Sequence, residues 1–144
     1  MTKRVLIVDD EPAVIKGLTD CFQCFEHGHA YEITSAGSAR EALAIAQREG
    51  FGFDLILLEL HITWIGEPFH QVWSPFHALD LLKQIRERGA KVPVIMMCGC
   101  DPDENEAEAL AAGAFAYLQK PFDLRVLDPL VARALGSGSR ATGG

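Results

Sequence analysis

Five short apolar runs alternate with amphipathic stretches along the chain, and no other feature restricts its fold as strongly. We expect the apolar runs to be strands, at residues 5–8, 31–36, 53–60, 92–97 and 114–118. Three of these runs are apolar throughout, which is typical of strands covered on both faces. Strands that alternate with crossover helices form a parallel sheet. The sequence therefore predicts an α/β fold.

The amphipathic stretches predict five helices, of which the third carries Leu79, Leu82 and Ile85 toward the sheet. The first is expected to begin at residue 12, the second at 38, the fourth in the acidic segment 101–108 and the fifth near 124. Pro12 suits the start of the first helix, because its missing N–H would have no partner there. Ser38 and Glu41 can cap the start of the second helix reciprocally. The fifth helix contains Pro129, which is unfavourable inside a helix, and we expect this helix to end at Leu135.

The stretch 136–144, rich in glycine and serine, has no apolar residue that could anchor it beyond one alanine. We therefore expect a single domain over residues 1–135, followed by a flexible tail over 136–144. The domain is long enough, and with 49% hydrophobic residues apolar enough, to bury a sizeable core.

The charge and cysteine content of the chain disfavour several classes of function. A formal net charge of −7 opposes direct binding to nucleic acid or to anionic lipid. The amino terminus has one short apolar run before acidic residues follow, which predicts neither a secretory signal nor a membrane span. We therefore expect a cytoplasmic location. The four cysteines are expected to be reduced thiols, without a disulfide framework.

Polar residues follow the expected strands at the edge where parallel strands end together. Asp9, Asp10 and Glu11 follow the first strand, Glu59 ends the third, and Lys120 follows the fifth. Clustered carboxylates repel one another unless a cation neutralises them, and oxygen ligands favour magnesium. The alternative is that these acids face water, and for Glu11 we prefer that interpretation.

Four segments of the chain resemble, in order and spacing, the landmarks of response-regulator receiver domains. They are VLIVDDEP, FDLILLEL, VPVIMM and GAFAYLQKPF. The resemblance implies a flavodoxin-like, doubly wound five-stranded parallel sheet of order 2-1-3-4-5 with five helices. It implies a signalling module of two-component systems rather than an enzyme. The partners it implies are a histidine kinase or a downstream signalling protein, with a homodimer left open, and no direct nucleic acid or membrane contact.

The resemblance also implies roles for individual residues. Asp9, Asp10, Glu59 and the backbone carbonyl of His61 would hold Mg²⁺. Glu59 would occupy the phosphoacceptor position, where the family has aspartate. These assignments describe a magnesium-dependent acceptor site at the end of the third strand.

Four further positions follow from the same resemblance. Cys98 would occupy the position of the family's hydroxyl residue, and Lys120 that of its phosphate-contacting lysine. Tyr117 matches an aromatic switch residue, with a partly buried structural tyrosine as the alternative. The bond before Pro121 would be cis, which is plausible because a proline follows.

Two of these positions depart from the family pattern. Glu59 is one methylene longer than aspartate, which misplaces its carboxylate for in-line attack on a phosphoryl group. Its length can instead bring it to Lys120 as an ion pair that imitates phosphorylation, or leave it on metal or in solvent. Cys98 would donate weakly where a hydroxyl bonds firmly. We therefore expect impaired or absent phosphorylation, with the domain acting as an interaction module.

A third departure is an aromatic insertion that follows the third strand. It contains Trp64, Phe69, Trp73 and Phe76, more apolar surface than a solvent loop requires. We expect an ordered lid or a partner-docking loop, with quiet packing on the domain itself as the alternative.

A second class of function is a redox or metal sensor on the same fold. It would use Cys98, Cys100 and the histidines at positions 61, 70 and 77, because imidazole and thiolate together suit zinc or copper. The spacing matches no zinc finger. A third class, a small hydrolase, is less favoured than the sensor, because the sequence offers no nucleophile with a base positioned beside it.

Overall fold

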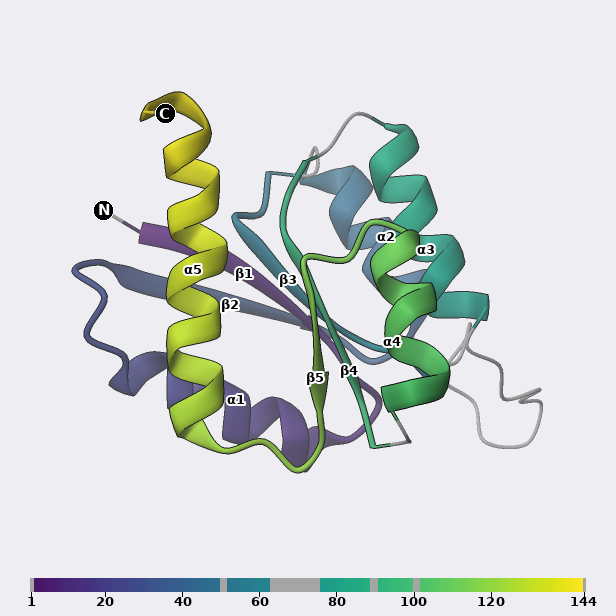
Figure 1. Ribbon diagram of the computed structural model, residues 1–144, viewed down its shortest axis with the longest axis horizontal. Helices are drawn as coiled ribbons and strands as arrows, with labels where there is room; N and C mark the ends of the chain where they lie inside the picture. The colour runs from purple at the N-terminus through teal and green to yellow at the C-terminus, as the bar shows by residue number, and fades with distance from the viewer. Residues whose placement is uncertain (1, 50–51, 63–75, 89–90, 100–101, 144) are drawn as a thin grey trace.

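Five parallel strands form one sheet in the computed structural model, in the order β2-β1-β3-β4-β5 (Figure 1). The structure describes residues 2–49, 52–62, 76–88, 91–99 and 102–143, without the side chains of 76–77, 102–105 and 137–143. The strands are β1 (Thr2–Val8), β2 (Ala30–Ala36), β3 (Leu55–Glu59), β4 (Val94–Cys98) and β5 (Ala116–Gln119). The helices are α1 (Pro12–Cys24), α2 (Ala39–Arg48), α3 (Phe76–Glu87), α4 (Pro102–Ala111) and α5 (Leu124–Gly143).

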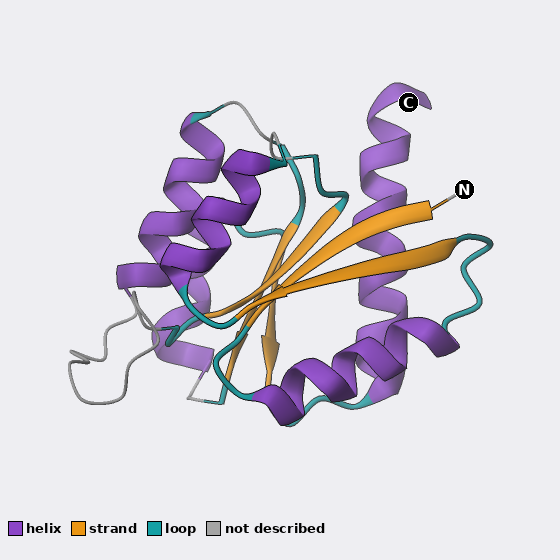
Figure 2. Cartoon of the chain, turned by 180° about the vertical axis from the view of Figure 1, so that it is seen from behind, coloured by secondary structure: helices purple, strands orange, loops and turns teal. Residues whose placement is uncertain are grey.

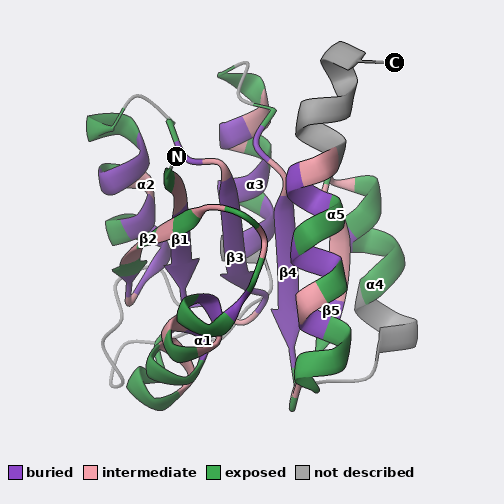
Figure 3. Ribbon diagram, turned by 90° about the vertical axis from the view of Figure 1, so that its left-hand side faces the viewer, coloured by how far each residue is buried: buried purple, intermediate pink, exposed green. Residues whose placement is uncertain are grey.

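Helices cover both faces of the sheet, as Figures 1 and 2 show. Helices α1 and α5 pack on one face, and α2, α3 and α4 pack on the other. Successive residues of a strand point to opposite faces. Val5 and Ile7 of β1 therefore pack on the side of α1 and α5, whereas Leu6 and Val8 pack on the side of α2, α3 and α4. Every residue of β3 and β4 is buried, as Figure 3 makes visible. The predicted α/β class and strand order are thereby confirmed.

The expected starts of α1, α2, α4 and α5 are confirmed, with one difference in the cap of α2. Helix α1 has proline in its first turn, and the Ser38 side chain caps α2 by accepting a hydrogen bond from the Glu41 N–H at 3.1 Å. The Glu41 carboxylate accepts its return bond from the N–H of Gly37, at 3.1 Å, rather than from that of Ser38. The chain therefore enters α2 in an orientation that brings the preceding amide within reach.

Helix α5 is longer than expected, because it continues to Gly143 instead of ending at Leu135. Asp123 begins it, accepting backbone hydrogen bonds from Val126 and Leu127. Pro129 lies inside the helix without ending it. The last buried residue described in α5 is Leu135. The domain boundary at 135 and the flexibility of 136–144 stay predictions.

Candidate functional site

Four polar side chains meet at the edge where the parallel strands end. Asp9 directly follows β1, Glu59 and Cys98 are the last residues of β3 and β4, and Lys120 directly follows β5. Asp9 is completely buried and Glu59 is 7% exposed, so both carboxylates are largely withdrawn from water. Buried carboxylates need a cation or hydrogen-bond donors nearby.

Lys120 is the cation of this cluster. Its Nζ donates to Asp9 Oδ2 at 2.6 Å and also to Glu59 Oε1. Burial opposes the charged ammonium, but the hydrogen bonds and charges of Asp9 and Glu59 outweigh it and raise the pKa of Lys120. The predicted ion pair between Glu59 and Lys120 is therefore present. The contact between Lys120 and Asp9 was not predicted, although both residues were placed at this edge.

The backbone at the end of β5 also holds Lys120 in place. The Lys120 N–H donates to the Cys98 carbonyl at 2.8 Å, which extends the pairing of β4 with β5. The Lys120–Pro121 peptide bond is cis, as expected. Lys120 is thus anchored to the neighbouring strand as well as to the two carboxylates.

The acids after β1 offer oxygen ligands to a hard cation. Carboxylate oxygens of Asp9, Asp10 and Glu11 lie within 4.8 Å of one another. Asp9 Oδ1 accepts a hydrogen bond from the Glu11 N–H at 2.9 Å, and both Asp10 and Glu11 are exposed. Burial and the negative charge of Asp9 raise the pKa of Asp10. A divalent cation would relieve that repulsion, so the donor set fits magnesium.

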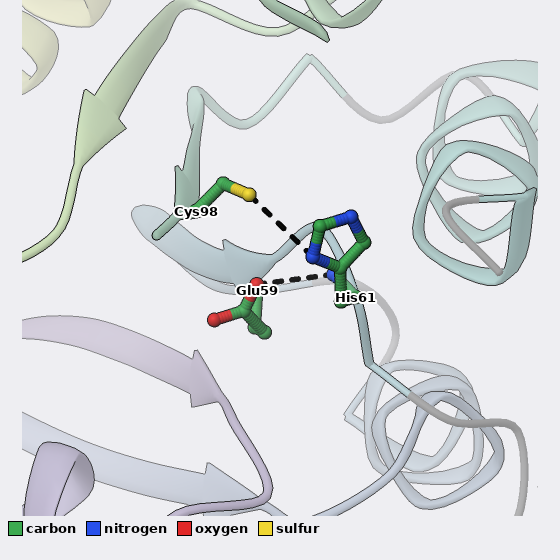
Figure 4. Close-up of side chains that lie close together, drawn as sticks. All are labelled: Glu59, His61 and Cys98. Atoms are coloured by element: carbon green, nitrogen blue, oxygen red, sulfur yellow. Dashed lines mark hydrogen bonds between the residues drawn. The ribbon is translucent and has the colours of Figure 1, made fainter. Parts of the chain in front are cut away.

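Glu59, His61 and Cys98 form a second cluster beside the first (Figure 4). The His61 N–H donates to Glu59 Oε2 at 3.0 Å, and the His61 ring nitrogen Nδ1 lies 3.5 Å from Cys98 Sγ. Burial lowers the pKa of His61, against the opposing effect of Glu59. We predicted a role for the His61 carbonyl, which stays a prediction. The proximity of its imidazole to Cys98 agrees with the grouping of these two residues in the alternative metal-sensor hypothesis.

Cys98 is disulfide-bonded. The expectation that all four cysteines are reduced is therefore wrong. Cys100 lies outside the described residues, while Cys21 and Cys24 are free thiols. The expectation rested on chain size and compartment, which cannot detect a local approach of two sulfurs. A disulfide sulfur has no proton, so Cys98 accepts from the His61 ring N–H and is not the weak donor we expected.

The remaining predicted site residues are only partly described. Tyr117 is half-buried in β5 and packs against the cluster between the sheet and α2 to α4, so its switching role stays a prediction. The insertion with Trp64, Phe69 and Trp73 lies outside the described residues, and so does the Phe76 side chain. The lid or docking role of the insertion is therefore not tested.

The sheet order, the covering helices and the carboxyl-edge cluster together define a flavodoxin-like signalling domain of the receiver type. The sequence model of the response regulator receiver domain matches residues 5–132. The chain belongs to this family. Receiver domains are generally signalling modules that interact with histidine kinases and downstream effector domains. No helix in the described part of the chain combines the length and apolar character needed to span a membrane.

Relatives and solved structures agree with this assignment. The chain is 34% identical over 137 residues to the response regulator protein FleR of Pseudomonas aeruginosa, covering 94% of this chain and 25% of that protein. It is 32% identical to the regulatory protein AtoC of Escherichia coli, covering 92% and 25%. A CheY-like receiver domain protein from Methanospirillum hungatei superimposes with a TM-score of 0.76 at 26% identity, covering 98% and 99%. The chain spans about a quarter of the first two relatives.

Proposed function

We propose that this receiver domain works mainly as an interaction module whose acceptor site is charge-balanced without phosphate. The observation that carries the proposal is that Lys120 bonds both Asp9 and Glu59. The ammonium is then already engaged where it would be needed to bind a phosphoryl group. Glu59 at the phosphoacceptor position is part of this proposal, and so are Cys98 at the hydroxyl position and Tyr117 as the switch.

Magnesium binding belongs to the same proposal. Asp9, Asp10, Glu59 and the His61 carbonyl would hold Mg²⁺, which when bound neutralises charge on a transferring phosphoryl group. The side chains of Asp9 and Glu59 each share an oxygen with Lys120, so a cation would compete with the ammonium for them. Magnesium can bind these oxygens only after the Lys120 ammonium has moved away from them. This additional step slows phosphoryl transfer.

The partners we propose are a histidine kinase or a downstream signalling protein, in the cytoplasm, with a homodimer as a further mode of association. A redox or metal sensor that replaces two-component signalling is not favoured, because the family match and the relatives point to response regulators.

The test is incubation with acetyl phosphate and Mg²⁺, followed by intact-protein mass spectrometry. Transfer of one phosphoryl group to a carboxylate would form an acyl phosphate and release acetate. We expect the protein to stay unmodified at Glu59, and the Glu59→Asp variant to be labelled, because the shorter carboxylate releases Lys120 and restores the attack geometry. Glu106→Asp, an exposed site on α4, is the matched control and should stay unlabelled.

A stable, stoichiometric adduct on Glu59 in the unaltered protein would overturn the proposal. If Glu59→Asp alone remains unlabelled, adding Cys98→Ser to it decides whether the missing hydroxyl is the further obstacle. Labelling of that double variant keeps the site assignment, and failure of both variants removes it.

A further inference from the structure

The cluster of Glu59, His61 and Cys98 combines a carboxylate, an imidazole and a sulfur at the carboxyl edge of the sheet (Figure 4). One ligand atom from each side chain lies within 4.8 Å of the other two. Glu59 and Cys98 end adjacent strands, and His61 follows two residues after Glu59. The rigid pairing of β3 with β4 therefore holds the three groups together.

The distance between sulfur and nitrogen suits a tetrahedral metal ion. With Zn–S and Zn–N bonds of about 2.3 and about 2.0 Å, tetrahedral angles place the two ligand atoms about 3.5 Å apart. Cys98 Sγ and His61 Nδ1 are 3.5 Å apart. Glu59 can contribute Oε2, because Lys120 engages its other oxygen, Oε1. The described residues thus supply three ligands, one each from Glu59, His61 and Cys98.

The local charge also favours a dication. Asp9 and Glu59 carry two negative charges against the single positive charge of Lys120, which leaves a net charge of −1. A thiolate at Cys98 would make the net charge −2. Zinc accepts nitrogen and sulfur ligands, whereas magnesium prefers oxygen alone.

We propose that reduction of the Cys98 disulfide opens a zinc site made by Glu59, His61 Nδ1 and Cys98 Sγ. A water-soluble phosphine breaks the S–S bond and takes the oxygen of one water molecule as phosphine oxide. The two hydrogens of that water end on the two thiols. The neutral His61 ring moves its proton from Nδ1 to Nε2 by exchange with solvent, which frees Nδ1 for the metal. Zinc then replaces the proton of the Cys98 thiol, which is released to solvent. The oxidised protein has no thiolate at this position and does not form the site.

Zinc binding stands independently of phosphorylation, but one consequence rests on the proposed function. Glu59 belongs to both the zinc set and the proposed magnesium set, so the two metals compete for it. After reduction, bound zinc would then occupy Glu59 and prevent phosphodonors from reacting at the acceptor site. Metal binding without any phosphodonor tests the site itself, so its failure is distinguishable from failure of the proposed function.

The experiment is a titration with Co²⁺ of protein reduced by a phosphine that is afterwards removed without oxygen. We expect one Co²⁺ per chain, with a sulfur-to-cobalt charge-transfer band that Zn²⁺ abolishes and Mg²⁺ leaves in place. Cys98→Ser should lose the band. His61→Gln should weaken affinity by more than about tenfold, because loss of even a second-shell partner costs that much. Cys24→Ser, an exposed free thiol on α1, is the matched control and should keep the band.

The oxidised protein should show no charge-transfer band, and reduction should restore it. Circular dichroism of each variant verifies the fold, and His61→Gln keeps the test decisive if Cys98→Ser does not fold. The proposal is wrong if the reduced protein lacks the band. It is equally wrong if Cys98→Ser keeps the band, or if His61→Gln binds Co²⁺ as tightly as the unaltered protein.

Discussion

At the scale of single residues, Lys120 balances two carboxylates that the fold withdraws from water. Its own side chain is 15% exposed, and those of Asp9 and Glu59 are 0% and 9% exposed. Removal of one partner from a buried ionic cluster leaves the other charges without compensation, which is more harmful than removal of the whole cluster. The stability of this edge therefore depends on the ammonium.

Replacing Lys120 with Gln should destabilise the protein by about 3 kcal/mol, because Asp9 and Glu59 would then face each other without a cation. Urea unfolding at neutral pH measures the change. Lys16→Gln is the control, since Lys16 and Asp20 form an exposed pair on α1 that contributes well under about 1 kcal/mol. Equal effects of the two substitutions would contradict the buried ionic cluster.

The alkaline behaviour of the same variant follows from the raised pKa of Lys120. The contribution of a group with a raised folded pKa is complete below its unfolded pKa, about 10.4 for lysine. It disappears as the pH rises through the higher folded value. The unaltered protein should therefore lose stability in that alkaline range, and Lys120→Gln should lose less.

At the scale of elements, His27 connects the segment before β2 to helix α5. Its Nδ1 lies 2.6 Å from the Tyr31 hydroxyl and its Nε2 lies 2.6 Å from Asp128 Oδ1. Phe25 stacks on the same ring, with centroids 4.8 Å apart. The two contacts of the His27 ring, with Tyr31 and with Asp128, thus hold α5 against the edge strand β2, at the end of the sheet away from the carboxylate cluster.

Replacing Tyr31 with Phe should cost about 1 kcal/mol, because it removes one hydrogen bond to His27 and keeps the packed ring. Burial raises the pKa of Tyr31 to about 12, so the hydroxyl stays protonated at neutral pH. Chemical unfolding gives the magnitude, with the exposed Glu26→Gln as the control in the same loop. An unchanged midpoint for Tyr31→Phe would show that the bridge contributes nothing.

The aromatic insertion provides a second prediction at this scale, from sequence alone. Replacing Trp64 and Trp73 together with Ala should alter self-association or partner binding more than thermal stability, because other segments build the sheet core. Thermal unfolding and analytical ultracentrifugation of the double variant measure both properties. A large fall in the unfolding midpoint with unchanged association would make the insertion part of the core.

At the scale of the whole molecule, two histidines make stability depend on pH in the same direction. Burial, with the positive charges of Lys3 and His27, lowers the pKa of His29, and burial lowers that of His61. Between the ordinary histidine pKa of about 6.5 and the lower folded values, the unfolded chain binds more protons than the folded one. Stability therefore rises with pH in that window and falls on acidification.

The His29→Gln variant should lose less stability than the unaltered protein when the pH is lowered from about 7.5 to about 5.5. His29 Nε2 is buried and has no hydrogen-bond partner within the described part of the chain, so charging it is unfavourable. Urea midpoints across the pH range give the two slopes. Parallel slopes would show that His29 does not contribute.

The sequence by itself predicted the end of each strand to within one residue, because hydrophobic periodicity and turn residues act locally. Asp9, Glu59 and Lys120 were placed at one edge from this pattern. The family resemblance added Cys98 and supplied the strand order and the cis bond before Pro121. The end of α5 was not predicted, because the helix continues beyond Leu135 without an apolar pattern that indicates it.

Only the tertiary structure decided how these side chains pair. Lys120 contacts Asp9 across 111 positions of sequence and Glu59 across 61, and which carboxylate it bonds depends on distances that packing sets. The disulfide at Cys98 and its contact with His61 depend on the same distances. A local pattern predicts the edge at which a side chain lies, but the geometry of the assembled sheet selects its partners.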